Sequence, residues 1–462
     1  MGSAPSMQQL MNPHVVAVFG GAVSGAEAAS QLAAQGIRTI VFDQHALPYG
    51  KIEDGLPKWH AKLRDKEEAN INDKLDHPLI TFVPNTKLGR DLDFRDVLDN
   101  WGFSAVLLAT GAWRDRPLPI PGVDEFVGKG LYYQNPFIHW FNHCHEPGYQ
   151  GARLRVADGA LVIGGGLASI DVAKALMMET VRRKLAERNV LVHMFDLERG
   201  IANVLAAHQL SIEDLGLAGC TLVYRRRIQD MPLFPGDTDT PEKMAKAEAV
   251  REKVLRTAQA RFLFNVLPCT VPVDKIIEDG RLQGLVLRST RVADGKVMEI
   301  RGSEQAFRTS LVISSIGSVP DPLPGVPMKG QTFAVETDAC CRIRGFHNVF
   351  ALGNAVTGRG NIRESMEHGR AVSTAIARNY LAAPEAYVGS QFREQAAAAA
   401  DATQRFVKDS LTGLPPISAA QAAHIFEKVA ARHQAVGYDG NFRKWVADHL
   451  PVRLEQLLGF RD

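Results

Sequence analysis

The sequence predicts an α/β protein with two three-layer domains, each built on a parallel sheet, and a helical extension at its C-terminal end. The main observation is that a buried strand, a glycine-rich turn and a helix follow one another at Val15–Gly36 and again at Ala160–Met177. The length agrees with this organisation. At about 150 residues per domain, 462 residues are enough for both units and a further segment.

The composition excludes several classes of protein. Hydrophobic residues make up 45% of the chain and charged residues 23%, which is typical of a globular protein and not of a disordered one. A formal net charge of +2 argues against a dedicated nucleic-acid binder, because it provides no general attraction for phosphates. The five cysteines are scattered and have no zinc-ligand spacing, so we expect no metal site. No apolar run spans a bilayer and the first residues lack a signal-peptide pattern, which predicts a reducing, cytoplasmic setting.

The first unit begins with the apolar run Val15–Phe19, which is typical of a strand buried on both faces. The turn that follows reads Gly20-x-Ala22-x-x-Gly25, a dinucleotide fingerprint with alanine at its middle position. Glycines let the backbone approach a pyrophosphate, and a helix N-terminus attracts its negative charge. A second strand ends at Asp43, where a carboxylate can accept hydrogen bonds from ribose hydroxyls. The unit therefore predicts a Rossmann-like dinucleotide-binding domain.

The second unit begins with the apolar strand Ala160–Ile163. Its turn keeps Gly164-x-Gly166, the helix follows from Leu167, and Ser169 stands where a third glycine is usual. A small residue at that position still permits close packing of the helix on the strand. The second unit therefore predicts a second dinucleotide-binding site in the same chain.

The end of the following strand decides which pyridine nucleotide the second unit prefers, and two candidate strands compete. The stretch Val190–Phe195 ends in Asp196, and a carboxylate there favours NAD. The stretch Cys220–Tyr224 is followed by three arginines, of which Arg225 and Arg226 come first, and guanidinium groups bind the 2′-phosphate of NADP. We favour NADP, with Val190–Gly219 as an insertion.

Three further segments complete the two units. The stretch Leu107–Ala112 is a strand that ends in a tight turn at Gly111, and Leu311–Gly317 is its counterpart in the second unit. Another buried strand, Val349–Gly353, comes after the second unit and before a glycine-rich turn and a helix. Because of its position we expect the first domain to be discontinuous.

Beyond these fingerprints the chain carries the segments Tyr49-Gly50, Gly55–His60, Phe137–Asn142, Tyr224–Arg226 and Met231-Pro232. With them, it resembles the adrenodoxin reductase type of ferredoxin–NADP reductase. This type belongs to the two-dinucleotide flavoproteins of the glutathione reductase superfamily and is related to the glutamate synthase small subunit. The resemblance runs from about residue 15 to residue 380.

The resemblance implies FAD in the first domain and NADPH in the second, with the nicotinamide stacked on the flavin. Gly353-Asn354 stands where related flavoproteins have Gly-Asp, so that Asn354 keeps a ribityl hydrogen bond without the charge. The turn at Gly358–Ile362 looks like the one whose N–H groups face the flavin pyrimidine edge. His60 takes the place of the family's histidine near the flavin, and Trp59 replaces its usual aspartate neighbour.

The motifs and the resemblance together assign one residue to catalysis, His60, and a larger set to cofactor binding. That set is Gly20, Ala22, Gly25, Asp43, Gly50, Gly111, Gly164, Gly166, Leu167, Ser169, Arg225, Arg226, Gly353, Asn354, Gly360 and Ile362. The expected FAD-binding domain covers residues 13–125 and 325–385, and the NADP-binding domain covers 126–324. The helical extension covers 386–462 and includes the alanine run Ala396–Ala400.

The expected route of the electrons follows from the lack of a redox-active cysteine pair after the first unit. No C-x-x-C follows it, and the adjacent pair Cys340-Cys341 is a poor substitute, so we expect electrons to leave the flavin directly for an external acceptor. We predict an FAD-dependent oxidoreductase that passes electrons from NADPH to a ferredoxin, or in the reverse direction. The alternatives are a flavin subunit of a larger complex, like those of glutamate synthase or dihydropyrimidine dehydrogenase, and a non-catalytic flavin-binding assembly subunit.

An acidic electron-transfer partner requires a basic docking face. Three groups of basic residues are candidates. They are Lys58, Lys62, Arg64 and Lys66; Arg182, Arg183 and Lys184; and Arg443, Lys444 and Arg453.

Overall fold

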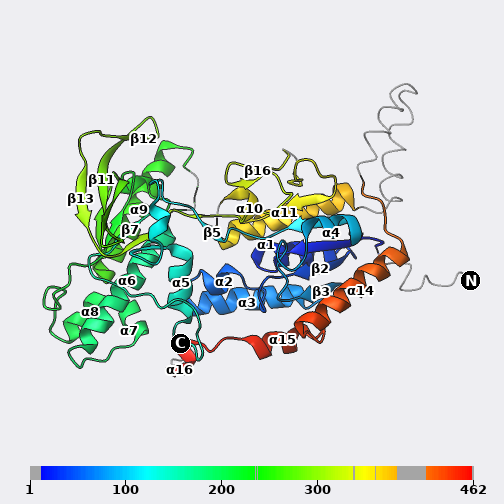
Figure 1. Ribbon diagram of the computed structural model, residues 1–462, viewed down its shortest axis with the longest axis horizontal. Coiled ribbons are helices and arrows are strands. Elements are labelled where there is room, and N and C mark those ends of the chain that lie inside the picture. Colours follow the sequence, from blue (N-terminus) through cyan, green and yellow to red (C-terminus); the bar gives the residue numbers. More distant parts are fainter. Residues whose placement is uncertain are drawn as a thin grey trace, which may run out of the picture. The chain divides into compact units, whose positions relative to one another are not determined.

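Figure 1 shows the computed structural model, which describes residues 12–234, 236, 238–336, 339–358, 360–381 and 413–459. The described residues form two compact units. Unit 1 takes them from Met1–Glu53, Ala61–Arg114 and Ser318–Val452, and unit 2 from Asp54–His60, Asp115–Gly317 and Arg453–Asp462. Within the described part of the chain, no helix is both long enough and apolar enough to cross a membrane.

Unit 1 is built on a five-stranded parallel sheet with the order β18-β4-β1-β2-β3. Its strands are β1 (Val15–Phe19), β2 (Arg38–Phe42), β3 (Ile80–Val83), β4 (Ala105–Leu108) and β18 (Val349–Ala351). β1 and β2 confirm the expected strands at 15–19 and at the residues before Asp43, whereas β4 begins two residues before the expected 107–112 and ends at Leu108, and β18 ends two residues before the expected 349–353 does. Because β18 pairs with β4, the sheet combines segments that are far apart in the sequence.

The two faces of this sheet are covered by different helices. Side chains alternate along a strand, so that Val16 and Val18 face one core while Val15 and Phe19 face the other. The first core receives helices α1 (Val23–Ala33), α3 (Ala61–Leu75) and α11 (Ile362–Tyr380). The second core receives α4 (Phe94–Asn100) and α14 (Ala419–Val436). The short elements of this unit are α2 (Lys51–Asp54, whose last residue belongs to unit 2), α10 (Asn354–Thr357), β16 (Met328–Lys329) and β17 (Thr332–Phe333).

The described part of the C-terminal tail is helical, as expected, and most of it packs into unit 1. Ile425 and Val429 of α14 are buried in the second core, and Trp445 of α15 (Phe442–His449) is buried in the first. The indole of Trp445 donates a hydrogen bond of 2.8 Å to the carbonyl of Ala46. The last helix, α16 (Leu454–Leu457), belongs to unit 2. The alanine run Ala396–Ala400 lies outside the described residues.

Unit 2 has a five-stranded parallel sheet with the order β6-β14-β7-β8-β9. Its strands are β6 (Leu131–Tyr133), β7 (Leu161–Ile163), β8 (Thr221–Val223), β9 (Asn265–Leu267) and β14 (Val312–Ser314). One face packs on helices α5 (Gln134–His143), α6 (Leu167–Ala186), α7 (Met194–Glu198), α8 (Ile201–Ala207) and α9 (Pro241–Phe262). The other face packs on an antiparallel sheet of β10 (Thr270–Glu278), β11 (Arg281–Ala293), β12 (Lys296–Glu299) and β13 (Gln305–Arg308). The third layer here is thus made of strands. Unit 2 also contains the short helices η2 (Val123–Phe126) and η3 (Ile228–Asp230); of the remaining short strands, β15 (Ser318–Val319) belongs to unit 1, and β5 (Arg114–Asp115) has one residue in each unit.

One expected alternative is wrong. The stretch Val190–Phe195 is not a strand: Leu191 is 88% exposed, and helix α7 begins at Met194. The strand that pairs with β7 is β8, which lies within the other candidate, Cys220–Tyr224. Asp196 therefore lies on a helix and not at a strand end, and the segment before β8 is a helical insertion.

Candidate functional site

The first glycine turn is tightly packed at its two outer glycines. A Cβ atom on Gly20 would lie 2.3 Å from the carbonyl oxygen of Ala109, and one on Gly25 would lie 1.7 Å from the carbonyl oxygen of Gly20. A side chain at position 20 would therefore push the turn away from the end of β4, and a side chain at position 25 would push α1 away from the turn. The N-cap of α1 is Ala22, whose side chain provides no hydrogen bond, so the N–H groups of the first turn have no side-chain cap and suit an anionic ligand.

Gly50 compensates for the alanine in this turn. It has a positive φ of 53°, and a Cβ atom on it would lie only 2.9 Å from the Cβ of Ala22. The methyl group of Ala22 thus occupies space that a side chain at position 50 would need. The turn therefore accommodates alanine at position 22 because position 50 is a glycine.

Asp43 braces the same turn. Its carboxylate accepts hydrogen bonds from the backbone N–H of Gly21 at 2.7 Å and of His45 at 2.9 Å, and the residue is only 4% exposed. A carboxylate can accept several hydrogen bonds, which suits this group at a strand end to a ribose hydroxyl. The structural role of Asp43 was not foreseen from the sequence.

Asn354 and Gly360, which the sequence assigns to flavin binding, lie together near the start of α11. A Cβ atom on Gly360 would lie 2.9 Å from the Nδ2 of Asn354. The Oδ1 of Asn354 is buried and accepts no hydrogen bond from any described residue. Such an acceptor suits a donor from a ligand, because an unmet buried acceptor is costly. Ile362 is the first residue of α11, whose N-cap Asn361 accepts a hydrogen bond from the backbone N–H of Glu364 at 2.7 Å.

Gly353 has a backbone conformation reserved for glycine, with φ 69° and ψ −149°. Its N–H donates to the Nδ1 of His368 at 3.0 Å, and burial lowers the pKa of that imidazole. His368 therefore holds the Gly353 turn, a role that the sequence analysis missed although the residue lies on α11. Gly111, at the end of β4, also has a positive φ, 68°, and its nearest neighbour is the indole nitrogen of Trp113 at 3.9 Å from a built Cβ.

The second glycine turn uses Ser169 in place of a third glycine. The Ser169 hydroxyl donates to the carbonyl of Ser315 at 2.9 Å, and a Cβ atom on Gly164 would lie within 2.3 Å of both groups. Ser169 thus fixes the turn to the end of β14. A Cβ atom on Gly166 would meet only a proline carbon at 4.0 Å, so the space in front of this N-cap is open. Leu167, the first residue of α6, is 56% exposed.

The three arginines after β8 differ in what they contact. Arg227 donates two hydrogen bonds to Asp230, at 2.8 and 3.0 Å. Neither Arg225, which is exposed, nor Arg226, which is half-buried, forms a side-chain hydrogen bond or ion pair with any residue in the described ranges. The side chains of Arg225 and Arg226 are thus available to a phosphate, whereas that of Arg227 is already bonded to Asp230.

His60 lies in unit 2 in a cationic and aromatic environment. Burial, together with the nearby charge of Lys174, lowers its pKa to about 4, so the imidazole is neutral at pH 7. The ammonium group of Lys174 lies 4.4 Å from the centre of the Trp59 ring and 3.5 Å from the carboxylate of Asp171. The indole Nε1 of Trp59 is buried and bonds to no described residue. A neutral imidazole suits hydrogen bonding and proton exchange.

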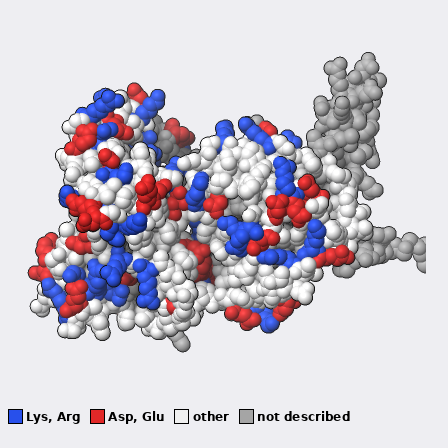
Figure 2. All heavy atoms as spheres, viewed as in Figure 1, with Lys and Arg blue, Asp and Glu red and all other residues white. Residues whose placement is uncertain are grey.

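The expected basic docking groups are largely neutralised within the protein. Lys58 and Arg64 are buried, at 7% and 5% exposure, which removes half of the first group. Arg182 pairs with Glu179 and Lys184 with Glu187, both at 2.7 Å. In the third group Arg443 pairs with Asp76 and Lys444 with Asp439, and Arg453 is buried. On the face drawn in Figure 2, basic and acidic side chains are interspersed. None of the three groups is the uniform basic face that we expected.

The comparison with known proteins begins with the family model. Residues 13–208 match the model described as pyridine nucleotide-disulphide oxidoreductase. This stretch contains both glycine turns, but it is less than half of the chain.

Individual relatives cover more of the sequence. The chain is 25% identical to the mitochondrial NADPH:adrenodoxin oxidoreductase of Arabidopsis thaliana, over 68% of this chain and 70% of that protein. It is 26% identical to the NADPH-ferredoxin reductase FprA of Mycobacterium tuberculosis, over 74% of this chain and 78% of that one. A third relative is the glutamate synthase [NADPH] small chain of Halomonas elongata, at 23% identity over 81% of this chain and 70% of that protein.

The solved structure of Mycobacterium tuberculosis FprA in complex with NADPH has a similar fold. It superposes with a TM-score of 0.65 over 91% of both chains, at 20% sequence identity. The likeness confirms the expected fold class.

Proposed function

Because the chain is a homologue of the adrenodoxin reductase type of ferredoxin–NADP reductase, we propose that it is an NADPH-dependent FAD oxidoreductase. It transfers reducing equivalents between NADPH and a small electron-transfer protein of the ferredoxin type. The observation that carries this proposal is the pair of strand–glycine–helix units, each with an open helix N-terminus.

Each unit is suited to one dinucleotide. In unit 1 we assign FAD to the turn at Gly20–Gly25, with Asp43 toward the ribose and the unpaired Oδ1 of Asn354 toward a ribityl hydroxyl. In unit 2 we assign NADPH to the turn at Gly164–Ser169. When bound, the two groups supply the redox chemistry, a hydride on the nicotinamide and a flavin that accepts electrons in pairs and releases them singly.

The preference for NADPH is attributed to Arg225 and Arg226. Their guanidinium groups follow β8, directly beside the strand that leads into the second glycine turn. They have no carboxylate partner among the described residues, whereas Arg227 has one in Asp230. Guanidinium and phosphate form charge-assisted, often bidentate hydrogen bonds, which NADH cannot offer at this position.

The chain's own contribution to the reaction is positioning and electrostatics. The N-terminus of the 19-residue helix α11 favours negative charge at the ligand that Asn354 and Gly360 contact. His60, as a neutral imidazole, is assigned to a hydrogen bond or proton exchange in the flavin environment.

The identity of the electron acceptor is the less defined part of the function. A ferredoxin-type protein is favoured because two of the relatives named above are reductases of ferredoxin or adrenodoxin. The alternative, a flavin subunit of a larger complex, is favoured by the relative named as a glutamate synthase small chain. Purification of the native complex separates the two, since a subunit would remain associated with larger chains. A cytoplasmic location belongs to the same proposal, and cell fractionation tests it.

The decisive experiment is anaerobic reduction of the purified protein. We expect a yellow protein whose flavin absorbance bleaches on addition of NADPH and returns on addition of an oxidised ferredoxin. As a control, Gly166→Asp places a carboxylate in the open space before α6, where it repels a pyrophosphate. This variant should keep its flavin, resist NADPH and still bleach with dithionite. A flavin that dithionite reduces but NADPH does not, in the wild-type protein, would instead identify a non-catalytic flavin-binding subunit.

A further inference from the structure

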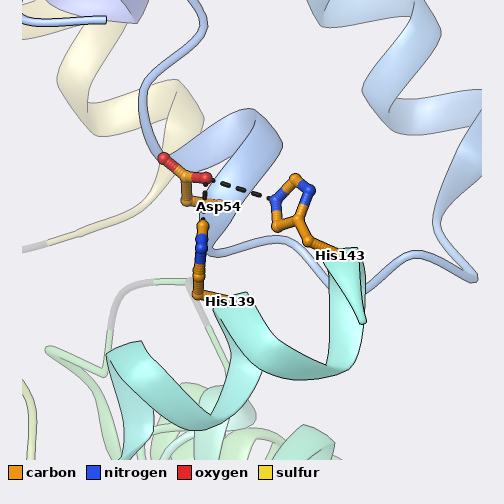
Figure 3. A group of neighbouring side chains, drawn as sticks. All are labelled: Asp54, His139 and His143. Carbon is orange, nitrogen blue, oxygen red and sulfur yellow. Dashed lines mark hydrogen bonds and ion pairs between the residues drawn. The ribbon is translucent and has the colours of Figure 1, made fainter. Parts of the chain in front are cut away.

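Unit 2 contains a compact group of two histidines and one carboxylate that the cofactor assignments do not use. Figure 3 shows that the rings of His139 and His143, from the last two turns of α5, both lie beside the carboxylate of Asp54. The two histidines are four residues apart, which places them on the same face of the helix. Their ring centres are 4.6 Å apart.

The distances between the ligand-capable atoms fit a small metal ion. The Oδ1 of Asp54 lies 3.1 Å from the Nδ1 of His139 and 3.3 Å from the Nε2 of His143. All three atoms lie within 4.8 Å of one another. In a tetrahedral site with bonds of about 2.0–2.1 Å, neighbouring ligand atoms are about 3.3 Å apart. Little rearrangement is needed to place an ion between them.

Two further residues hold this group in position through hydrogen bonds. The Oε1 of Glu146 lies 2.5 Å from the Nδ1 of His143, the ring nitrogen that faces away from Asp54. A carboxylate on the second nitrogen is the usual support of a metal-binding histidine, because it fixes the ring and raises its basicity. Asn142 binds the segment that follows Asp54, accepting from the N–H of Lys58 and donating to the carbonyl of Leu56, both at 2.9 Å.

We propose that Asp54, His139 and His143 form a binding site for a divalent transition metal ion, with Zn²⁺ as the matching ion. Two imidazoles and one carboxylate select such ions over Mg²⁺ and Ca²⁺, which require oxygen ligands. With neutral histidines, the charges of Asp54 and Glu146 together balance the dication. The side chain of His139 is 48% exposed, so the fourth position is open to water.

The ion acts as a clamp within unit 2. It joins α5 to Asp54, the first residue of the segment 54–60 of this unit, which ends at His60. Without a metal, the same atoms form a hydrogen-bonded network. In it the carboxylates of Asp54 and Glu146, acting against the effect of burial, raise the pKa of His143 to about 9.

The test is a Zn²⁺ titration of the chelator-treated, flavin-containing protein by calorimetry, with Mg²⁺ in a parallel run. We expect one Zn²⁺ per chain and no response to Mg²⁺. Zinc X-ray absorption should show nitrogen and oxygen ligands without a sulfur shell at about 2.3 Å, which excludes the neighbouring Cys144 as a ligand. Both readouts are independent of NADPH oxidation, so the proposed function can fail or hold separately.

Variants assign the ion to these residues. His139→Gln and Asp54→Asn should each weaken Zn²⁺ binding by more than about 100-fold, and Glu146→Gln by about 10- to 100-fold. His208→Gln removes an exposed histidine of the same unit, at the end of α8, and should bind Zn²⁺ as the wild-type protein does. Circular dichroism and flavin content verify that each variant is folded. Equal affinity in the wild type, His139→Gln and Asp54→Asn would mean an adventitious ion only and would overturn the proposal, as would the absence of stoichiometric binding.

Discussion

Replacing Arg225 and Arg226 together by alanine should remove most of the preference for NADPH over NADH. A hydrogen bond to a charged group contributes about 1.5–3 kcal/mol. Arg225 is exposed and Arg226 half-buried, so solvent screening reduces the contribution of each to the lower part of that range or below it. A combined loss of about 2–3 kcal/mol corresponds to a change of about 30- to 150-fold in the ratio of kcat/KM values.

The assay is steady-state reduction of a dye or ferricyanide with NADPH and with NADH, at two ionic strengths. We expect kcat/KM for NADPH to fall, kcat/KM for NADH to stay within about twofold, and the effect to shrink at high salt. Arg227→Ala is the matched control, because this arginine already donates two hydrogen bonds to Asp230. The reasoning is refuted if the double variant keeps its preference, or if Arg227→Ala loses as much as the double variant does.

Three other variants test the surroundings of the two glycine turns. Glu27→Gln removes a buried carboxylate that forms ion pairs with the partly exposed Lys74 and Arg370. This substitution should lower the free energy of unfolding by about 2 kcal/mol in urea titrations. The control Glu367→Gln, at an exposed ion pair, should change it by less than about 0.5 kcal/mol. Gly50→Ala should lower the free energy of unfolding by about 1–3 kcal/mol and lower the flavin content. Adding Ala22→Gly should restore part of the lost stability. If the effects of the two substitutions on the free energy of unfolding were fully additive, this would contradict the contact between them. Because His60 has a folded-state pKa of about 4, the unfolded chain binds its proton first as the pH falls below 6.5, and the free energy of unfolding declines by up to about 3 kcal/mol between pH 6.5 and pH 4. His60→Asn should flatten this decline in denaturation curves between pH 7 and pH 4, and an unchanged slope would show that folding does not lower the pKa of His60.

Strands that are short apolar runs leading into a glycine turn, such as β1, β7 and β18, could be predicted from the sequence, whereas β3, β6 and β9 are not followed by such a turn and were not predicted. The error at Val190–Phe195 has a visible cause. Its apolar residues do not form a strand; instead Met194, Leu197 and Ile201 are buried at helical spacing, and the pattern continues into α8. A test for the helical period over a longer window would have separated the two candidates before the structure was known.

The site residues also divide into those that could be predicted from the sequence and those that could not. Positions within a fingerprint, such as Gly20 and Gly164, are predicted by local spacing, and the packing distances now explain why they are glycines. Contacts between distant segments had no local signal, and His139 and Asp54 are 85 positions apart. The basic groups were overestimated because their acidic partners were not counted, although Glu179 stands only three residues before Arg182.

The order of the strands in unit 1 has a consequence for synthesis on the ribosome. Strand β4 is translated about 240 residues before its neighbour β18, and the whole of β6 to β14 emerges in between. At about 5–20 residues per second, the edge of β4 waits for roughly 12 to 50 seconds with its hydrogen-bonding groups unpaired. Unit 2 can therefore complete its main fold before β18 completes the sheet of unit 1.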